Sequence, residues 1–311
     1  MTRMPHTDLD VFPLSLGGNV FGWTANEEQS FAVLDAYAAA GGNFIDTADM
    51  YSCWAPGNSG GESETIIGRW MKKRGNRSKM VIATKVGNLP SLLGLSTKTI
   101  QRAVEGSLER LQTDHIDLYY AHVDDRATPL IESLAAFDGL VRSGKVRYIA
   151  ASNYNAPRLA EALRACRREG FAQYVALQQH YNLMERQKYE GELEETVAAE
   201  GLGSLPYYSL ASGFLTGKYR TGSKVDSKRA EGAGAYLNDK GRKVLGALDE
   251  IAGTRKEAVA TIALAWLAAQ PTVVAPIASA RTPEQLPPLL RAADVHLTKE
   301  EVLKLSAASA A

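Results

Sequence analysis

The amino-acid sequence predicts an α/β protein with the architecture of a (β/α)8 TIM barrel. Short apolar runs rich in β-branched residues alternate with longer helical patterns from one end of the chain to the other, which is typical of a parallel sheet covered by helices. There are about eight such runs, the number of strands that closes a barrel. The 311 residues are expected to form one domain, 1–311, because single barrels commonly exceed roughly 250 residues.

The predicted strands are short and rich in β-branched residues. A doubly wound sheet is the competing architecture, but no G-x-G-x-x-G motif stands at a first strand-to-helix turn to hold a pyrophosphate. A barrel is therefore favoured. The strands are expected at Leu14–Leu16, Phe44–Thr47, Val81–Lys85, Ile116–Tyr120, Val146–Ala150, Val175–Leu177, Gly203–Tyr207 and Val273–Pro276.

Capping residues place the starts of several helices. Asn26, with Gln29 three residues later, predicts a capping box, and Ser96 is expected to cap a later helix. Pro129 and Asn155 mark two further starts. The helix after Ser96 should lie against the outside of the sheet, because its apolar residues recur at helical spacing. These residues are Ile100, Val104, Leu108 and Leu111.

Composition narrows the class of protein. The formal net charge is zero, with 35 basic and 35 acidic residues, so there is no broad attraction to nucleic acid or to anionic lipid. The apolar stretch Ala258–Ala269 is shorter than the ~20 residues that span a bilayer, and it predicts a buried helix. The N-terminus lacks the apolar core of a secretory signal, which favours the cytoplasm. Cys53 and Cys166 are expected to be reduced thiols.

Polar side chains stand at the carboxyl ends of three predicted strands. Asp46 ends the second strand, Lys85 the third and His122 the fourth. In a barrel these ends converge on one cavity. A strand-end Asp or a lone His is usually structural, but a buried Lys beside Tyr51 would stabilise phenolate while Asp46 balances the Lys charge. Tyr51 is therefore expected to donate a proton near neutral pH.

A metal-dependent hydrolase on the same barrel is the first alternative, since Asp46 and His122 are also possible metal ligands. No His-x-His follows a strand, and the remaining histidines show no coordination spacing. We therefore predict no metal site. These remaining histidines are His6, His115, His180 and His296.

The strand-end residues resemble the catalytic tetrad of the aldo-keto reductase superfamily. They occur in the segments Asp46-Thr47-Ala48-Asp49-Met50-Tyr51, Ala83-Thr84-Lys85 and Tyr120-Ala121-His122. Other segments resemble the bacterial and channel-β-subunit-like branches, and together they span most of the chain: Gly61-Glu62-Ser63-Glu64, Ser152-Asn153, Tyr181-Asn182-Leu183 and the run from Leu210 to Lys218. The resemblance implies an NADPH-dependent reduction of an aldehyde or ketone. Tyr51 would protonate the carbonyl oxygen, and His122 would hold and polarise it.

The resemblance also implies a set of cofactor contacts. Ser152, Asn153 and Gln178 match the residues that hold the nicotinamide carboxamide, and Tyr207 matches the aromatic residue on which the ring stacks. Residues near the pyrophosphate would be Leu210, Ser212 and Gly213, and those at the adenosine end would include Arg281 and Gln285. A guanidinium fork at Arg281 could pair with a 2′-phosphate, which favours NADPH over NADH.

Departures from the family pattern concern the adenosine end. Ser279 stands where Gly is common, Leu289 stands where Asn is common, and Pro287-Pro288 replaces a polar pair. Beside the nicotinamide, Tyr207-Tyr208-Ser209-Leu210 replaces the usual Tyr-Ser-Pro-Leu. Adenine recognition is therefore expected to be weaker or differently built.

The surroundings of the site are less constrained by the sequence. Trp23 and Trp54 are expected to form walls of a substrate pocket for apolar or aromatic carbonyls, with plain packing as the alternative. The stretch from Thr216 to Asn238 predicts a mobile surface loop. A second functional hypothesis is a non-catalytic NADPH-binding redox sensor or scaffold subunit, and the oligomeric state is left open. Basic residues of the loop that could add charge near the pyrophosphate are Arg220, Lys224 and Arg229.

Overall fold

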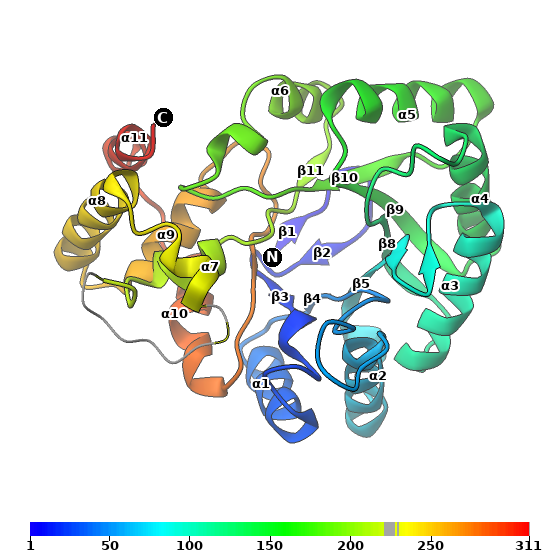
Figure 1. Cartoon of the computed structure of the whole chain (residues 1–311), viewed down its shortest axis with the longest axis horizontal. Coiled ribbons are helices and arrows are strands. Elements are labelled where there is room, and N and C mark those ends of the chain that lie inside the picture. The colour runs from blue at the N-terminus through cyan, green and yellow to red at the C-terminus, as the bar shows by residue number, and fades with distance from the viewer. Residues whose placement is uncertain (221–227, 229, 311) are drawn as a thin grey trace.

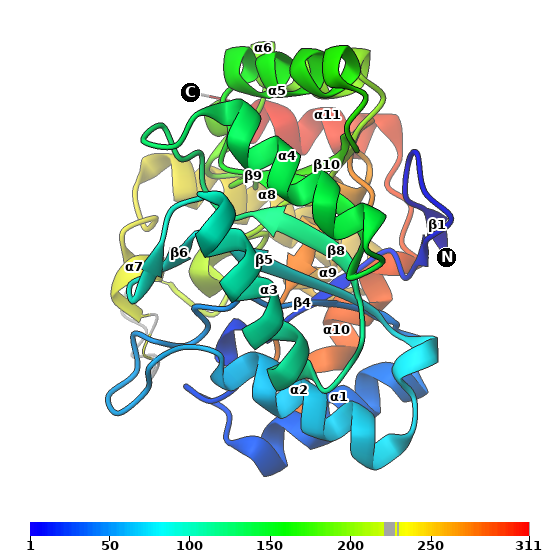
Figure 2. The same ribbon diagram turned by 90° about the vertical axis from the view of Figure 1, so that its right-hand side faces the viewer.

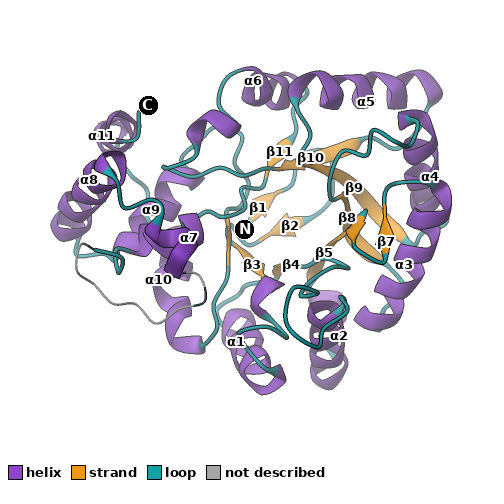
Figure 3. Ribbon diagram, in the orientation of Figure 1, coloured by secondary structure: helices purple, strands orange, loops and turns teal. Residues whose placement is uncertain are grey.

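A ring of helices surrounds a central group of parallel strands, as Figure 1 shows. The computed structural model describes residues 1–220, 228 and 230–310. Colouring by secondary structure shows the strands at the centre and the helices outside them (Figure 3). The prediction of a (β/α)8 barrel is confirmed by this arrangement.

Eight strands form one parallel sheet in the order β11-β10-β9-β8-β5-β4-β3-β12. Each strand other than β12 lies beside a strand that is near it in the sequence, as expected when a helix links successive parallel strands. Their bounds are β3 (Ser15–Gly17), β4 (Phe44–Asp46), β5 (Val81–Val86), β8 (Ile116–Ala121), β9 (Val146–Ser152), β10 (Tyr174–Gln178), β11 (Gly203–Ser204) and β12 (Ile277–Ala278).

The two ends of this sheet meet and close the barrel. Val274 N donates to Ser204 O (3.0 Å), and Ile277 N donates to Pro206 O (2.8 Å). Here the predicted bounds were wrong: the seventh strand ends at Ser204 rather than Tyr207, and the last strand is Ile277–Ala278 rather than Val273–Pro276. The apolar residues from Val273 onward contact β11, and regular pairing with β3 begins only at Ile277. Hydrophobicity alone therefore placed the last strand too early in the chain.

Eleven α-helices are assigned within the described residues, and most of them pack on the outside of the sheet (Figure 1). Two antiparallel hairpins, β1 (Thr2–Arg3) with β2 (Asp10–Val11) and β6 (Asn88–Leu89) with β7 (Leu92–Leu93), lie outside the main sheet. The helices are α1 (Glu27–Ala39), α2 (Glu62–Arg74), α3 (Thr97–Leu111), α4 (Leu130–Arg142), α5 (Ala156–Glu169), α6 (Glu192–Ala199), α7 (Ala230–Gly234), α8 (Asp239–Arg255), α9 (Val259–Ala268), α10 (Leu286–Leu290) and α11 (Lys299–Ala308).

The helix starts follow the predicted caps. Asn26 and Gln29 form both bonds of a capping box at α1, Ser96 caps α3 and Asn155 caps α5. Pro129 is the residue just before α4 rather than its first residue. The four apolar residues predicted for the inner face of α3 are all buried. The apolar run near residue 260 forms the buried helix α9, and among the described residues no helix is long and apolar enough to cross a membrane.

The N-terminal hairpin fills one end of the barrel. Met4, Leu9 and Val11 are buried in a cluster with inward-facing residues of the strands, among them Phe44 and Tyr120. Figure 2 shows β1 at one end of the molecule and β6 and α7 at the other. The open end of the barrel is therefore the one formed by the carboxyl ends of the strands.

The segment predicted as a loop between Thr216 and Asn238 contains a short helix, α7. The prediction of a loop was therefore wrong for Ala230–Gly234, whereas residues 221–227 and 229 lie outside the described residues. Arg220 is paired with Asp249 through Nη1 (2.8 Å) and Nη2 (2.7 Å) of its guanidinium, so its charge is already balanced. Lys224 and Arg229 lie outside the described residues.

Candidate active site

A buried lysine links three residues at the mouth of the barrel. Lys85, near the end of β5, donates from Nζ to Asp46 Oδ2 (2.8 Å), to the carbonyl oxygen of Thr47 (2.7 Å) and to the hydroxyl of Tyr51 (3.1 Å). Its side chain is completely buried. Adjacent strands place these groups together, since Asp46 ends β4 and β4 pairs with β5. The contact of Lys85 with Thr47 was not anticipated, because it is made by the backbone.

Burial and neighbouring charges shift the pKa values of Lys85 and Tyr51. Burial alone would lower the pKa of Lys85, but the charge of Asp46 and the nearby Tyr51 outweigh burial and raise the pKa of the ammonium. Lys85 is therefore a cation at neutral pH. Burial raises the pKa of Tyr51 above its ordinary value, and the charge of Lys85 opposes this only in part. The phenol is therefore fully protonated at neutral pH, and in the free chain it is a weaker acid than the sequence led us to expect.

His122 follows β8 and lies next to Tyr51. The two rings are 6.1 Å apart between centroids and almost perpendicular, at 75°. Burial, followed by the charge of Lys85, lowers the pKa of His122 to about 3. The imidazole is therefore neutral at physiological pH, with one N–H donor and one acceptor. Its Nδ1 is buried and has no hydrogen-bond partner in the part of the chain that the structure describes.

The four residues expected around a nicotinamide lie side by side. Ser152 pairs in register with Gln178, and Gln178 Nε2 donates to Asp46 Oδ1 (2.8 Å), which ties this group to the lysine. Asn153 donates from Nδ2 to the carbonyl oxygen of His122 (2.9 Å) and to Ser152 Oγ (3.1 Å). The hydroxyl of Tyr207 donates to Asn153 Oδ1 (2.8 Å). Amide groups beside an aromatic ring are a donor set that fits a flat carboxamide-bearing ligand.

The segment expected near the pyrophosphate has an unusual backbone. Ser212 and Gly213 have φ values of 57° and 97° inside the short 3-10 helix that follows Leu210. These left-handed residues turn the chain sharply, and the N–H of Gly213 donates to the carbonyl oxygen of Leu210 (2.8 Å). Ser212 also lies close to Gly232 of α7. Leu210, Ser212 and Gly213 therefore lie together in one tight turn.

The adenosine-end residues are arranged around a turn after β12. The backbone N–H of Arg281 donates to Gln285 Oε1 (2.9 Å), so Gln285 has a structural bond in addition to its expected contact with cofactor. The guanidinium of Arg281 makes no ion pair within the described residues. Ser279 donates to Asn19 Oδ1 (2.7 Å). Leu289 is buried in the main core.

Trp23 and Trp54 form an aromatic wall beside the tyrosine. Their rings meet edge to face with centroids 5.8 Å apart, and the ring of Trp54 is 5.6 Å from that of Tyr51. Trp54 is 41% exposed, which is unusual for a side chain held only by core packing. The structure therefore brings both tryptophans to the mouth, next to the candidate proton donor.

A buried acidic pair behind the site was not anticipated. Asp49 is 1% exposed and Glu64 is fully buried. Glu64 accepts from Arg110 Nε (2.7 Å) and from Thr84 Oγ1 (2.5 Å), whereas neither carboxylate oxygen of Asp49 has a partner among the described residues. Burial, followed by the charge of Glu64, raises the pKa of Asp49 to about 8. The only signal in the sequence was a second aspartate within a buried segment.

This pair gives a testable pH dependence of stability. The unfolded chain releases the proton of Asp49 at about pH 4 and the folded chain at about pH 8, so stability falls as pH rises between these values. Replacing Asp49 with Asn should remove a slope of about 1.4 kcal/mol per pH unit. Urea unfolding should show Asp49→Asn more stable than the parent at pH 8 and similar to it at pH 4. Equal pH profiles would contradict this, and Asp294→Asn on the surface is the control.

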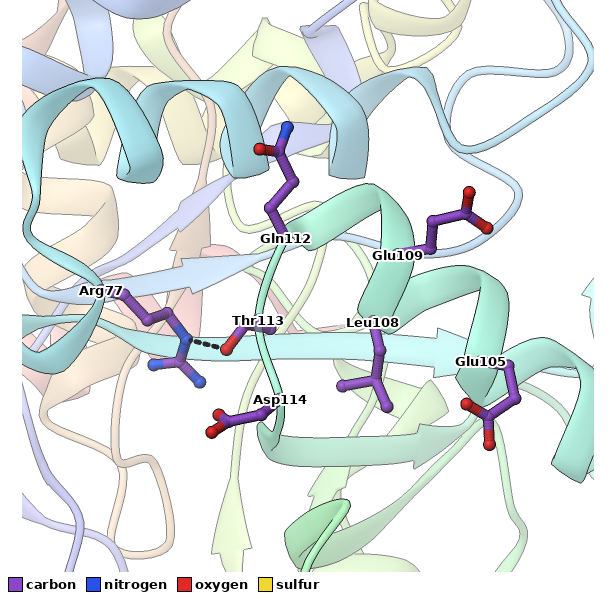
Figure 4. A pocket seen from close by; sticks show the side chains of 7 residues that line it. All are labelled: Arg77, Glu105, Leu108, Glu109, Gln112, Thr113 and Asp114. Atoms are coloured by element: carbon purple, nitrogen blue, oxygen red, sulfur yellow. Dashed lines mark hydrogen bonds between the residues drawn. The ribbon is translucent and has the colours of Figure 1, made fainter.

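A hollow also lies at a distance from these residues. It has a volume of about 910 Å³ and lies beside the C-terminal end of α3, where Arg77 Nε donates to Thr113 Oγ1 (2.9 Å) (Figure 4). It is wide open, its lining contains no residue of the site at the mouth, and we assign it no function. Among the described residues there is no group of three or more His, Cys, Asp or Glu side chains that could hold a metal ion. Cys53 and Cys166 are both free thiols.

Comparison with known proteins shows similarity over almost the whole chain. The sequence model of the Aldo/keto reductase family matches residues 13–310. An uncharacterized oxidoreductase, YrpG, of Bacillus subtilis (strain 168) is 39% identical, over 96% of this chain and 92% of its own length. A probable voltage-gated potassium channel subunit beta of Oryza sativa subsp. japonica is 34% identical, over 98% and 95%. Norsolorinic acid reductase B of Aspergillus parasiticus is 33% identical, over 96% and 81%.

Proposed function

The chain belongs to the aldo/keto reductase family, and from this premise we propose that it reduces an aldehyde or ketone to an alcohol with NADPH. Membership supports oxidoreductase chemistry with a nicotinamide cofactor in general. The observation that supports the specific proposal is the hydrogen bond from Lys85 Nζ to Tyr51, with Asp46 on the same ammonium. A proton donor, a charge that tunes it and a counter-ion are thus held together at the open end of the barrel.

In the proposed reaction, Tyr51 protonates the oxygen of the carbonyl. When the carbonyl carbon accepts a hydride, its oxygen becomes an alkoxide, which is a much stronger base than phenolate, so a phenol with a raised pKa still transfers its proton. Lys85 stabilises the phenolate that remains, and Asp46 keeps Lys85 charged and in place. Neutral His122 donates a hydrogen bond to the same oxygen and orients it.

The cofactor site that we propose uses the remaining predicted residues. A bound nicotinamide would supply the hydride. Ser152, Asn153 and Gln178 would hold its carboxamide, because their polar groups meet at the ends of β9 and β10, and Tyr207 would support the ring. The turn at Leu210, Ser212 and Gly213 would face the pyrophosphate, and Arg281 with Gln285 would bind the adenosine end.

For the substrate we propose an apolar or aromatic carbonyl compound. Trp23 and Trp54 stand beside the proton donor and present ring faces and edges rather than charges. Aromatic side chains favour flat apolar ligands, because offset and edge-to-face contacts add to the area that is buried. Norsolorinic acid, which appears in the name of the relative norsolorinic acid reductase B, is one compound to test.

The preference for NADPH is tested at Arg281. Its guanidinium has no ion-pair partner in the described structure, so it is available for a 2′-phosphate. Arg281→Ala should weaken NADPH binding by roughly tenfold to a hundredfold, as expected for a hydrogen bond to a charged group, with NADH binding nearly unchanged. Titration by cofactor fluorescence measures both constants, with Arg291→Ala as the control. Equal losses for the two cofactors would remove Arg281 from this role.

The proposed function is tested by titrating the purified protein with NADPH and then adding a panel of aldehydes and ketones. Carbonyl-dependent oxidation of bound NADPH is the expected result. Tight binding without oxidation across the panel would instead support the non-catalytic sensor or scaffold role, to which the similarity with a potassium channel subunit draws attention. An absence of NADPH binding would contradict both.

A further inference from the structure

His180 lies against Tyr207 at the mouth of the barrel. Its ring is stacked on that of Tyr207, with centroids 5.4 Å apart and an interplanar angle of 28°. The ring of Tyr208 is 5.2 Å from the imidazole and tilted. The pairing is enforced by the backbone, because His180 and Tyr207 are partners in a parallel β-bridge and Tyr207 N donates to Gln179 O (2.9 Å).

One nitrogen of the His180 imidazole, Nδ1, has a hydrogen-bond partner. Lys188 Nζ is 3.2 Å from Nδ1 of His180, and since an ammonium only donates, Nδ1 must accept and the proton is on Nε2. Nε2 is buried and has no hydrogen-bond partner in the described part of the chain. Burial, followed by the charge of Lys188, lowers the pKa of His180 to about 4. The ring is therefore neutral, and its centroid lies 5.4 Å from that of the Tyr207 ring and 5.2 Å from that of the Tyr208 ring.

The stacking of His180 restrains the rotation of the Tyr207 ring. The side chain is fixed at its backbone end and at its hydroxyl, which donates to Asn153. A tyrosine held at these two ends can still rotate about the axis that joins them. A flat group stacked on one face restrains this rotation and does not itself cover the other face. The ring of Tyr208 is also near Tyr207, with centroids 5.4 Å apart and an interplanar angle of 60°.

We propose that His180 is a positioning residue for the reduction: by stacking on one face of Tyr207, it fixes the plane against which the nicotinamide ring lies on the other face. This inference rests on the proposed function, since it needs a bound nicotinamide. Hydride transfer depends on the distance and alignment of the two carbon atoms, so a tilt of the supporting ring changes the rate of the chemical step.

The experiment compares three variants of the full chain by single-turnover oxidation of bound NADPH, by NADPH titration and by thermal unfolding. His180→Ala removes the ring, His180→Phe keeps a flat ring without nitrogens, and His296→Ala changes an exposed histidine as a control. We expect His180→Ala to slow hydride transfer and weaken NADPH binding by about threefold to tenfold each, the size of an aromatic pair. His180→Phe should stay within about twofold of the parent.

A double-variant comparison separates positioning from folding. Tyr207→Leu is measured alone and together with His180→Ala. If His180 acts through Tyr207, the combined variant is no slower than Tyr207→Leu, so the two effects are not additive. Additive losses would overturn the proposal.

Other outcomes are equally decisive. A folded His180→Ala with the rate and affinity of His296→Ala would overturn the proposal while leaving the reductase function intact. A His180→Phe variant as impaired as His180→Ala would assign the role to a nitrogen rather than to stacking, and would also overturn it. If the parent chain neither binds NADPH nor oxidises it, the proposed function and this inference fall together.

Discussion

Replacing Tyr51 with Phe should lower turnover by about a hundredfold or more while leaving NADPH binding nearly unchanged. The substitution removes the hydroxyl that lies 3.1 Å from Lys85 Nζ and keeps the ring beside Trp54. Proton transfer by a positioned side chain typically contributes 10²- to 10⁴-fold to a rate, with only small effects on ligand binding. Steady-state kinetics and cofactor titration on the same preparation separate the two effects.

The matched control is Tyr148→Phe. Tyr148 also uses its hydroxyl, to bind Asp8 at the closed end of the barrel, so its loss tests whether removing any structural tyrosine hydroxyl impairs the protein. We expect parental turnover for this variant. Turnover of Tyr51→Phe equal to that of the parent would mean that another group protonates the oxygen.

Replacing Lys85 with Met should affect both turnover and folding. The substitution leaves the buried carboxylate of Asp46 without its cation, and breaking a buried pair in this way costs about 3–5 kcal/mol of unfolding free energy. It also removes the charge that stabilises the phenolate of Tyr51, so turnover should be lost together with stability. Chemical denaturation and the carbonyl-reduction assay measure the two consequences.

A second substitution distinguishes these consequences. In the combined variant Lys85→Met with Asp46→Asn, both members of the pair are neutral, so much of the stability should return while turnover stays low. Lys243→Met on the exposed face of α8 is the control for replacing a lysine by methionine. Recovery of turnover in the combined variant would show that the charge of Lys85 is not needed for the chemistry.

The repetition of strand and helix made the barrel predictable, whereas its closure was not. Capping residues such as Asn26 and Ser96 are local signals, and they placed helix starts correctly. The last strand was misplaced because its position is set by hydrogen bonds to β11 and β3, which are distant in the sequence. The helix α7 was missed because its composition resembles that of a loop.

At the site, the side chains that end strands could be predicted and the interactions behind them could not. Asp46, Lys85 and His122 stand at positions that any barrel brings together, so their meeting follows from topology. The acidic pair of Asp49 and Glu64 and the stacking of His180 on Tyr207 depend on contacts between elements, which one sequence does not specify. The raised pKa of Tyr51 was likewise missed, because it depends on how deeply the phenol is buried.

The N-terminal hairpin has a consequence for how the chain folds. Met4 packs in one cluster with Val274 and Ile277, so the first and last parts of the chain contribute to a single core. Ser15 in β3 likewise pairs with Ile277 in β12. Contacts between such distant segments form slowly, because the chain must lose the entropy of closing a long loop before these contacts stabilise it. On the ribosome, the barrel therefore cannot close until almost the whole chain has emerged, and the core around Met4 is completed only then.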